Sequence, residues 1–174
     1  MSIYSTPFRE VLIVEHKSEW AELFGAEVSI LHEHIGDIVS DIQHVGSTAV
    51  PGLLAKPILD IAVAVSSRGA ISQIAERLSK IGYIDRGDGG NNGGYLIVKE
   101  SELDIRIVHI HIVELTDIQW QNYIRFRDVL RQDAAIRQKY AELKQNLAEK
   151  YRDDRKSYTA AKAEFIKGVL GRHA

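Results

Sequence analysis

One carboxylate, Asp60, interrupts an otherwise apolar run at residues 58–65 and is the residue best placed to do chemistry. In a strand covered on both faces, an ionised carboxylate is costly unless it is paired or bound to a metal. A Gly46-Ser47-Thr48 turn precedes this run, and glycine allows successive backbone N–H groups to form an anion-binding nest. We therefore predict that the turn holds a phosphate and that Asp60 binds a metal or a ligand hydroxyl. The structural alternative is an Asp60 that hydrogen-bonds to the turn or pairs with a nearby Arg or Lys.

His109 and His111 alternate along a run rich in β-branched residues, so a strand would place both imidazoles on one face, about 7 Å apart. Both could then reach one metal or one anion. His44, directly before the Gly-Ser-Thr turn, is a further candidate ligand. The alternatives are ring nitrogens satisfied by backbone carbonyls and, for His44, a surface position on a short strand. We carry forward Asp60, His109 and His111 as catalytic candidates, and the same three with His44 as metal ligands.

Two cations are placed to neutralise the charge of a bound phosphate. Lys56 leads into the strand of Asp60, where it could also balance that carboxylate. Arg127 lies in a predicted helix beside Asp128, which could simply pair with a helix neighbour. We expect Gly46, Ser47, Thr48, Lys56 and Arg127 to form the phosphate-binding set.

Two Tyr-x-x-x-Lys pairs recur in the last third of the chain, at Tyr140–Lys144 and at Tyr158–Lys162. Each pair falls on one helical face. They could line one polar pocket, but we interpret them as tyrosines at the edge of the core with solvated lysines.

Hydrophobic periodicity and turn residues place these side chains on an alternation of strands and helices followed by a helical tail. Ala62 and Ala64 share a face with Asp60 and leave room either for a ligand or for a packed helix. A glycine- and asparagine-rich segment at residues 87–94 predicts a mobile hairpin or lid. We expect strands at about residues 11–14, 41–45, 58–65, 95–99 and 103–113, and helices at about residues 18–35, 71–81, 116–129, 133–147 and 158–170.

Two stretches, HVGSTAVPG at residues 44–52 and AKPILDI at residues 55–61, resemble the signature of the GrpB-like family, which belongs to the nucleotidyltransferase superfamily. HIHIV at residues 109–113 and FRDVLR at residues 126–131 are similar to later segments of that family. The resemblance covers nearly the whole chain. It implies an α+β (mixed α/β) fold: a nucleotidyltransferase-like core with a mixed β-sheet and packed helices, followed by a C-terminal three-helix segment. We expect residues 1–174 to form one domain, with the core at about 8–115 and the tail at about 116–172.

The resemblance also implies roles for individual positions. Gly46 and Ser47 match the nucleotide-positioning Gly-Ser of the superfamily, and Asp60 matches its first metal-binding acid. Ala62 stands where the second acid is expected. For the third acid, from a later strand, the chain offers His109 and His111, with Asp104 on the opposite face. One Asp with two His suits a single, softer metal better than the Mg²⁺ pair of two-metal phosphoryl transfer.

Composition narrows the range of functions. The chain has 174 residues, a formal net charge of -2 and no cysteine. Nothing here indicates the basic surface of a nucleic-acid-binding protein, a disulfide framework, or a thiolate or Cys-based zinc site. No apolar run reaches the roughly 20 residues of a membrane helix and no signal peptide is apparent, so we expect a cytoplasmic protein without a membrane partner. The oligomeric state is left open.

The leading hypothesis is a nucleotidyltransferase-fold protein that binds a nucleotide or phosphorylated small molecule, with or without metal-dependent nucleotidyl transfer to a small-molecule hydroxyl. The cofactor would be a divalent metal such as Mg²⁺, Mn²⁺ or Zn²⁺. A non-catalytic ligand-binding or regulatory module is the alternative, motivated by Ala62. A single-metal hydrolase that uses Asp60, His109 and His111 is a third.

Overall fold

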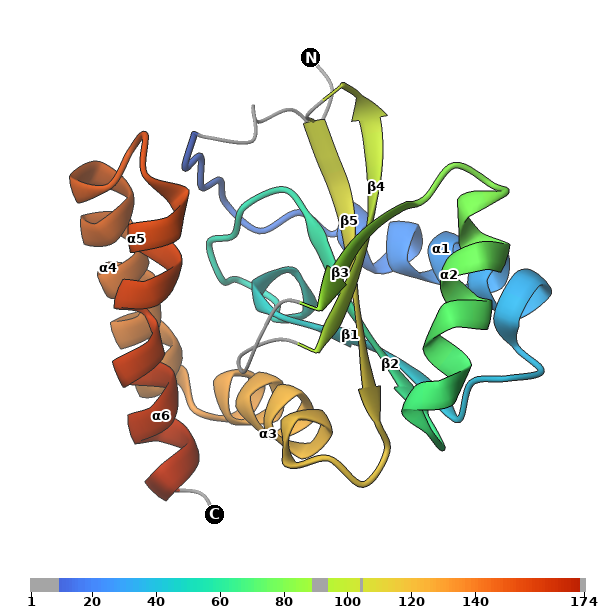
Figure 1. The fold of residues 1–174 in the computed structure, drawn as a ribbon. Helices are drawn as coiled ribbons and strands as arrows, with labels where there is room; N and C mark the ends of the chain where they lie inside the picture. The colour runs from blue at the N-terminus through green and yellow to red at the C-terminus, as the bar shows by residue number, and fades with distance from the viewer. Residues whose placement is uncertain (1–9, 89–93, 104, 173–174) are drawn as a thin grey trace.

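The structure, a computed structural model, describes residues 10–88, 94–103 and 105–172 (Figure 1). A five-stranded mixed sheet with the strand order β1-β2-β5-β4-β3 forms its centre. Strands β2 and β5 run parallel, and the other neighbouring pairs are antiparallel. The strands are β1 (Asp41–Val45), β2 (Leu59–Val65), β3 (Ile84–Asp88), β4 (Tyr95–Glu102) and β5 (Ile105–Glu114).

One face of the sheet is covered by α1 (Glu19–Ile35) and α2 (Ile71–Ser79), which lie together on the right in Figure 1. Alternate residues of β2 and β5 point to this side, because side chains in a strand alternate between the two faces. The resulting core is mainly apolar. Its most buried members include Trp20, Leu31, Ile35, Ile61, Val63, Val65, Ile74, Leu78, Ile110 and Ile112.

The opposite face of β2 and β5 is covered in part by α3 (Ile118–Gln132). Ala62 and Ala64 pack there with Trp120, and the partly buried Tyr123 lies against the same cluster. Of the two uses suggested for these small side chains, the structure shows helix packing. Asp60 lies two residues before Ala62 on the same face of β2 and is outside this cluster.

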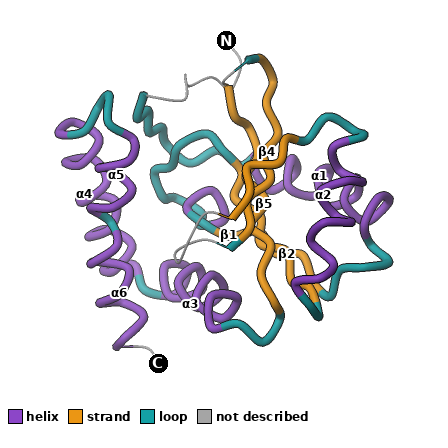
Figure 2. The backbone as a smooth tube through the Cα atoms, viewed as in Figure 1, coloured by secondary structure: helices purple, strands orange, loops and turns teal. Residues whose placement is uncertain are grey.

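The remaining helices are α4 (Ala134–Lys150), α5 (Arg155–Ala161) and α6 (Ala163–Arg172). They stand together on the left in Figures 1 and 2, separated from the sheet by the loop that follows β1. Val50 and Leu53 of that loop pack with Leu130 and Tyr140, and Phe165 of α6 joins them. This apolar cluster fixes the helical group at a set distance from the sheet, and the pocket lies between the two.

Most of the expected elements are present, and the fold class is confirmed as α+β with a mixed sheet. The strand expected at residues 11–14 is reduced to a single bridge between Val14 and Ala55. The capping residue of α3 is Asp117. The single helix expected at residues 158–170 is two, α5 and α6, so the tail contains four helices. Of the loop expected at residues 87–94, residues 89–93 lie outside the described residues, as does Asp104.

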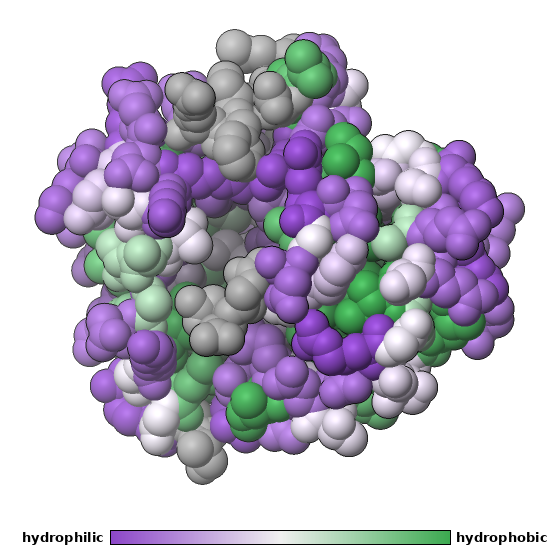
Figure 3. All heavy atoms as spheres, in the orientation of Figure 1, coloured by the Kyte–Doolittle hydropathy of each residue, from purple (hydrophilic) through white to green (hydrophobic). Residues whose placement is uncertain are grey.

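Figure 3 shows that hydrophilic side chains cover most of the face seen there, with hydrophobic groups in smaller patches. None of the helices in the described ranges combines the length and the apolar character that crossing a membrane requires.

Candidate functional site

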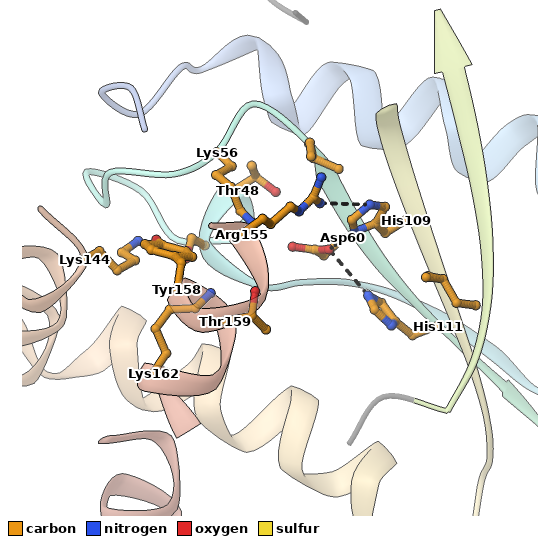
Figure 4. A pocket seen from close by; sticks show the side chains of 13 residues that line it. Thr48, Lys56, Asp60, His109, His111, Lys144, Arg155, Tyr158, Thr159 and Lys162 are labelled. Atoms are coloured by element: carbon orange, nitrogen blue, oxygen red, sulfur yellow. Dashed lines mark hydrogen bonds and ion pairs between the residues drawn. The ribbon is translucent and has the colours of Figure 1, made fainter. Parts of the chain in front are cut away.

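A pocket of about 280 Å³ opens between the polar face of β2 and β5 and the helices α4 and α5 (Figure 4). Its walls combine one carboxylate with several cationic and hydroxyl groups, while Ile58 and Leu96 supply apolar area. The turn after β1 and the N-terminal part of α5 face each other across it. The lining residues are Ser47, Thr48, Lys56, Ile58, Asp60, Leu96, His109, His111, Lys144, Arg155, Tyr158, Thr159 and Lys162.

Asp60, His109 and His111 form a compact cluster on the sheet side of the pocket. The parallel register sets Asp60 beside His109 and Ala62 beside His111, so both imidazoles flank one carboxylate. Asp60 Oδ1 lies 3.3 Å from His109 Nδ1 and 3.4 Å from His111 Nε2. The alternation of side chains along β5 therefore does bring both histidines to Asp60.

Burial and hydrogen bonding set the charge state of this cluster. Burial of the Asp60 carboxylate opposes its ionisation, but the hydrogen bonds and charges of His109 and His111 outweigh it and hold its pKa well below the usual value. Burial lowers the pKa of His109 to about 4, although the hydrogen bond to Asp60 acts in the opposite direction. Near neutral pH the cluster thus holds an ionised Asp60 and a neutral His109, the states in which each can bind a metal.

The donor set fits one divalent metal and does not fit two. One ligand atom from each of Asp60, His109 and His111 lies within 4.8 Å of the others, and two nitrogens with one oxygen suit Zn²⁺ or a similar ion. Asp60 is the one carboxylate among the described residues that line the pocket. A Mg²⁺ pair needs several oxygen ligands, so this set does not support one.

The Gly46-Ser47-Thr48 turn approaches Asp60 so closely that its first residue has to be glycine. Gly46 has φ = 69°, and a Cβ added there would lie 2.6 Å from Asp60 Oδ2. The short helix η1 (Ser47–Ala49) follows at once and presents the hydroxyls of Ser47 and Thr48 to the pocket. Lys144 Nζ donates to Ser47 Oγ at 3.0 Å and also to the carbonyl of Leu54.

Four cations, Lys56, Lys144, Arg155 and Lys162, surround the pocket. Burial, together with the charges of Arg155 and Lys162, lowers the pKa of Lys56 to about 6. Burial likewise lowers the pKa of Lys144 to about 7 and that of Lys162 to about 8. Near neutral pH Lys56 is therefore largely neutral and Lys144 about half protonated in the ligand-free protein, and an anion placed among these basic groups would favour their charged forms.

Besides Gly46, two predicted site residues, His44 and Arg127, lie outside the pocket lining. His44 is buried, stacks on Phe24 at 4.7 Å and shares a hydrogen bond of 2.9 Å with Thr48, so it supports the turn from behind. Burial lowers the pKa of its imidazole to about 4. The guanidinium of Arg127 donates to Gln43 Oε1 and to the carbonyl of His44, which ties α3 to β1. Both residues act on the site by holding β1 and its turn in place.

Three cations of the pocket were missed or misread. Lys144 is only 2% exposed and bonded to Ser47, and Lys162 lines the pocket, so the interpretation as solvated lysines is wrong. The repeated Tyr-x-x-x-Lys spacing was the available signal, since Lys144 lies over the ring of Tyr140 and Lys162 over that of Tyr158. Arg155 carried no such signal, because it looks like an ordinary residue in the first turn of a polar helix.

Sequence comparisons place the chain among known proteins. A family model described as GrpB protein matches residues 10–172. The glutamate-rich protein GrpB of Alkalihalophilus pseudofirmus is 40% identical over 164 residues, which cover 92% of this chain and 94% of that protein. The protein YqkA of Bacillus subtilis is 35% identical over 92% of this chain and 46% of its own length.

Comparisons with solved structures agree with the sequence comparisons. The crystal structure of conserved protein GrpB from Enterococcus faecalis superposes with a TM-score of 0.81 at 29% identity and covers 93% of this chain and 99% of that one. The structure of Cid1 in complex with the UTP analog UMPNPP superposes with a TM-score of 0.53 at 15% identity and covers 78% of this chain and 42% of Cid1. At that identity the second likeness shows the fold alone.

Proposed function

The chain belongs to the GrpB family and has a nucleotidyltransferase-like fold, and from this premise we propose that it binds a nucleotide or another phosphorylated small molecule. The observation that carries the proposal is the wall of four cations, Lys56, Lys144, Arg155 and Lys162, around a turn that presents two hydroxyls. A neutral or cationic ligand would leave these basic groups desolvated and the lysines partly deprotonated. A phosphate would pair with them through charge-assisted hydrogen bonds.

Different residues of the pocket contact different parts of the ligand in this proposal. Ser47 and Thr48 contact the phosphates from the sheet side, while the lysines and Arg155 neutralise their charge from the helices. Ile58, Leu96 and Tyr158 supply the apolar area against which a base or sugar could pack. Nothing in this arrangement selects one base, so the proposal is limited to the phosphorylated class.

Thermal unfolding tests the proposal. UTP, ATP, CTP, GTP and coenzyme A precursors are each added at high concentration, with the matching nucleosides as phosphate-free controls. A ligand at about 100 times its dissociation constant stabilises the protein by about 2.7 kcal/mol. In a chain of this size that raises the Tm by roughly 5–10 °C.

Two lysines on the same helix pair provide the control for charge. Lys162→Met should weaken binding of the active nucleotide about tenfold, because the lysine lines the pocket. Lys167→Met removes an exposed cation from α6 and should leave affinity unchanged. Equal stabilisation by nucleosides and nucleotides, or equal affinity in the two variants, would refute a phosphate site at this position.

A second candidate function, metal-dependent transfer of the nucleotidyl group to a small-molecule hydroxyl, is favoured by the Asp60-His109-His111 cluster. A bound divalent cation would supply positive charge to the phosphate oxygens. Asp60 would hold that cation or orient the acceptor hydroxyl, and the imidazoles of His109 and His111 would complete its ligand set. Pyrophosphate release from a nucleoside triphosphate in the presence of Mn²⁺ or Zn²⁺ measures this activity.

Asp60→Asn separates the two functions. It should abolish metal-dependent turnover while the folded protein keeps its phosphate affinity within a few-fold. Retained turnover would remove Asp60 from the mechanism. Absence of any product with any metal, together with tight nucleotide binding, would favour the non-catalytic binding module. Stoichiometric Zn²⁺, Mn²⁺ or Fe²⁺ in the purified protein, with hydrolysis and no transfer, would favour the single-metal hydrolase.

A further inference from the structure

Arg155, the first residue of α5, reaches across the pocket to His109 (Figure 4). Its Nη2 lies 3.4 Å from His109 Nε2, while the other ring nitrogen of His109 lies 3.3 Å from Asp60 Oδ1. A guanidinium can only donate hydrogen bonds. His109 Nε2 is therefore the acceptor, and the ring proton sits on Nδ1 and is donated to Asp60.

This arrangement uses the only lone pair that a neutral imidazole offers. If a metal were bound at Nδ1, the ring proton would move to Nε2 and two N–H donors would face each other. If a metal were bound at Nε2, the metal would need the place that Arg155 Nη2 occupies. The contact between Arg155 and His109 and a metal bound to His109 therefore exclude each other, whichever nitrogen is the ligand.

Arg155 also belongs to the cationic wall of the pocket. The charges of Arg155 and Lys56 repel each other, and so do those of Arg155 and Lys162, whereas Asp60 attracts the guanidinium. A planar guanidinium binds phosphate through paired N–H donors better than it binds one imidazole nitrogen. The side chain is long and half-buried, so it can change partner by rotamer changes while α5 stays in place.

We propose that Arg155 is a positioning residue that couples the two parts of the pocket: it occupies His109 until an anion draws it away, and so links metal binding to phosphate binding. This inference rests on the proposed phosphate site. It predicts an order of events in which the phosphorylated ligand binds first or together with the metal. The protein would then hold a metal weakly until its ligand is present.

Calorimetric titration with Zn²⁺ at fixed pH, without and with saturating sulfate, tests the coupling. Sulfate serves as the phosphate stand-in because it chelates Zn²⁺ only weakly. In the unmodified protein, sulfate should tighten Zn²⁺ binding about tenfold, within the usual range for coupled sites. Arg155→Met should bind Zn²⁺ without sulfate as tightly as the unmodified protein does with it, and the sulfate effect should fall below about twofold.

Two further variants separate the contact from simple charge. Arg155→Lys keeps the charge but ends about one bond short of His109, so it should resemble Arg155→Met. Lys156→Met removes the exposed neighbouring cation and should resemble the unmodified protein. If Arg155→Lys keeps the weak Zn²⁺ binding and the full sulfate effect, charge alone governs the site and the inference is overturned.

Titration of sulfate alone distinguishes failure of the inference from failure of the phosphate site. Sulfate that binds in the pocket, with Zn²⁺ affinity equal in the unmodified protein and Arg155→Met, would overturn the coupling and leave the phosphate site standing. Sulfate that does not bind at all would overturn both. Zn²⁺ that binds Arg155→Met and not the unmodified protein would support the coupling in its strongest form.

Discussion

The two faces of β2 differ sharply in what they contact. On the face toward α1 and α2, Leu59, Ile61, Val63 and Val65 are at most 2% exposed and belong to the main apolar core. On the other face, Ala62 and Ala64 pack under α3, and the side chain of Asp60 remains 34% exposed in the pocket. One strand thus carries the main core on one side and the candidate site on the other.

This difference indicates that one face of β2 serves mainly stability and the other mainly ligand binding. The α1–α2 face is mainly apolar, so its contribution to stability comes chiefly from burial and close packing. The pocket face concentrates cations that lose hydration without gaining enough opposite charge, which is unfavourable in the ligand-free protein. Residues on the first face should therefore matter mainly for stability, and residues on the second mainly for binding.

The largest expected effect is on the core face. Ile61→Ala should lower the free energy of unfolding by about 2–5 kcal/mol, because Ile61 is fully buried and its removal leaves a cavity. Lys162→Met on the pocket side should leave stability unchanged or raise it slightly, because it removes a crowded cation. Urea unfolding of both variants measures the contrast. A loss for Lys162→Met as large as that for Ile61→Ala would show that the pocket face is as structural as the core.

Two buried histidines should make the protein acid-sensitive. The pKa of His44 and that of His109 are each lowered from 6.5 to about 4 by burial, so between these values the unfolded chain binds more protons than the folded one. Stability should therefore decrease as pH falls from about 6.5 to 4, by up to about 3 kcal/mol for each histidine. Asp60 acts only below this window, because its folded pKa lies below its usual value and its contribution is lost at still lower pH.

Unfolding free energies measured across that pH range check this prediction. His44→Gln keeps a hydrogen-bonding side chain beside Thr48 but does not titrate, so it should remove about half of the acid dependence. An unchanged pH dependence in this variant would mean that His44 is already hydrated and protonated in the folded protein.

A pair of glycines tests the closeness of the turn to Asp60. Gly46 and Gly52 both have positive φ, but a Cβ at Gly46 would meet Asp60 whereas a Cβ at Gly52 would meet nothing within 4 Å. Gly52→Ala should cost about 1 kcal/mol for the backbone strain alone. Gly46→Ala should cost about 2 kcal/mol or more and should also weaken binding of the nucleotide, because Asp60 and Ser47 have to move. Equal stability losses would show that Asp60 yields easily.

The sequence was sufficient for the elements with strong periodicity and weak for those without it. Residues 58–65 form a continuous apolar run with a single acid, and α2 repeats its apolar residues at helical spacing, so both were predictable. The strand β3 was missed, because Ile84–Asp88 is a polar edge strand whose pattern of burial does not alternate. The division between α5 and α6 at Lys162 was missed as well, because apolar residues continue at helical spacing across it.

The candidate site, too, was predictable from the sequence only in part. Asp60 and the two histidines were predictable as neighbours because strand alternation fixes which face a side chain takes. The cations that complete the pocket come from helices more than 80 residues further along the chain than Asp60, and their position depends on how α4 and α5 pack against the loop after β1. The Tyr-x-x-x-Lys repeat was a hint for two of the lysines, but it does not encode how the helices pack, which is why Lys144 was misread and Arg155 was missed.

The smallest expected effect on binding comes from a comparison of two helix N-caps, Asp154 of α5 and Asp117 of α3. Asp154 accepts a hydrogen bond from the backbone N–H of Ser157 and caps α5, which carries the Arg155 and Tyr158 side chains of the pocket. Asp117 caps α3, which supplies no described residue of the pocket lining. Asp154→Ala and Asp117→Ala should each cost about 1 kcal/mol of stability.

Binding should respond to only one of these two changes. Asp154→Ala should fray the first turn of α5, so the backbone that carries Arg155 is no longer held in place. Affinity for the active nucleotide should then fall about three- to fivefold. Affinity in Asp117→Ala should stay within the error of the titration, because α3 supports the sheet from outside the pocket. If both variants lost affinity equally, the helices and the sheet would form a single unit in which the site depends on overall stability. Selective loss in Asp154→Ala would instead make the α5 terminus the element through which the helical group acts on the ligand.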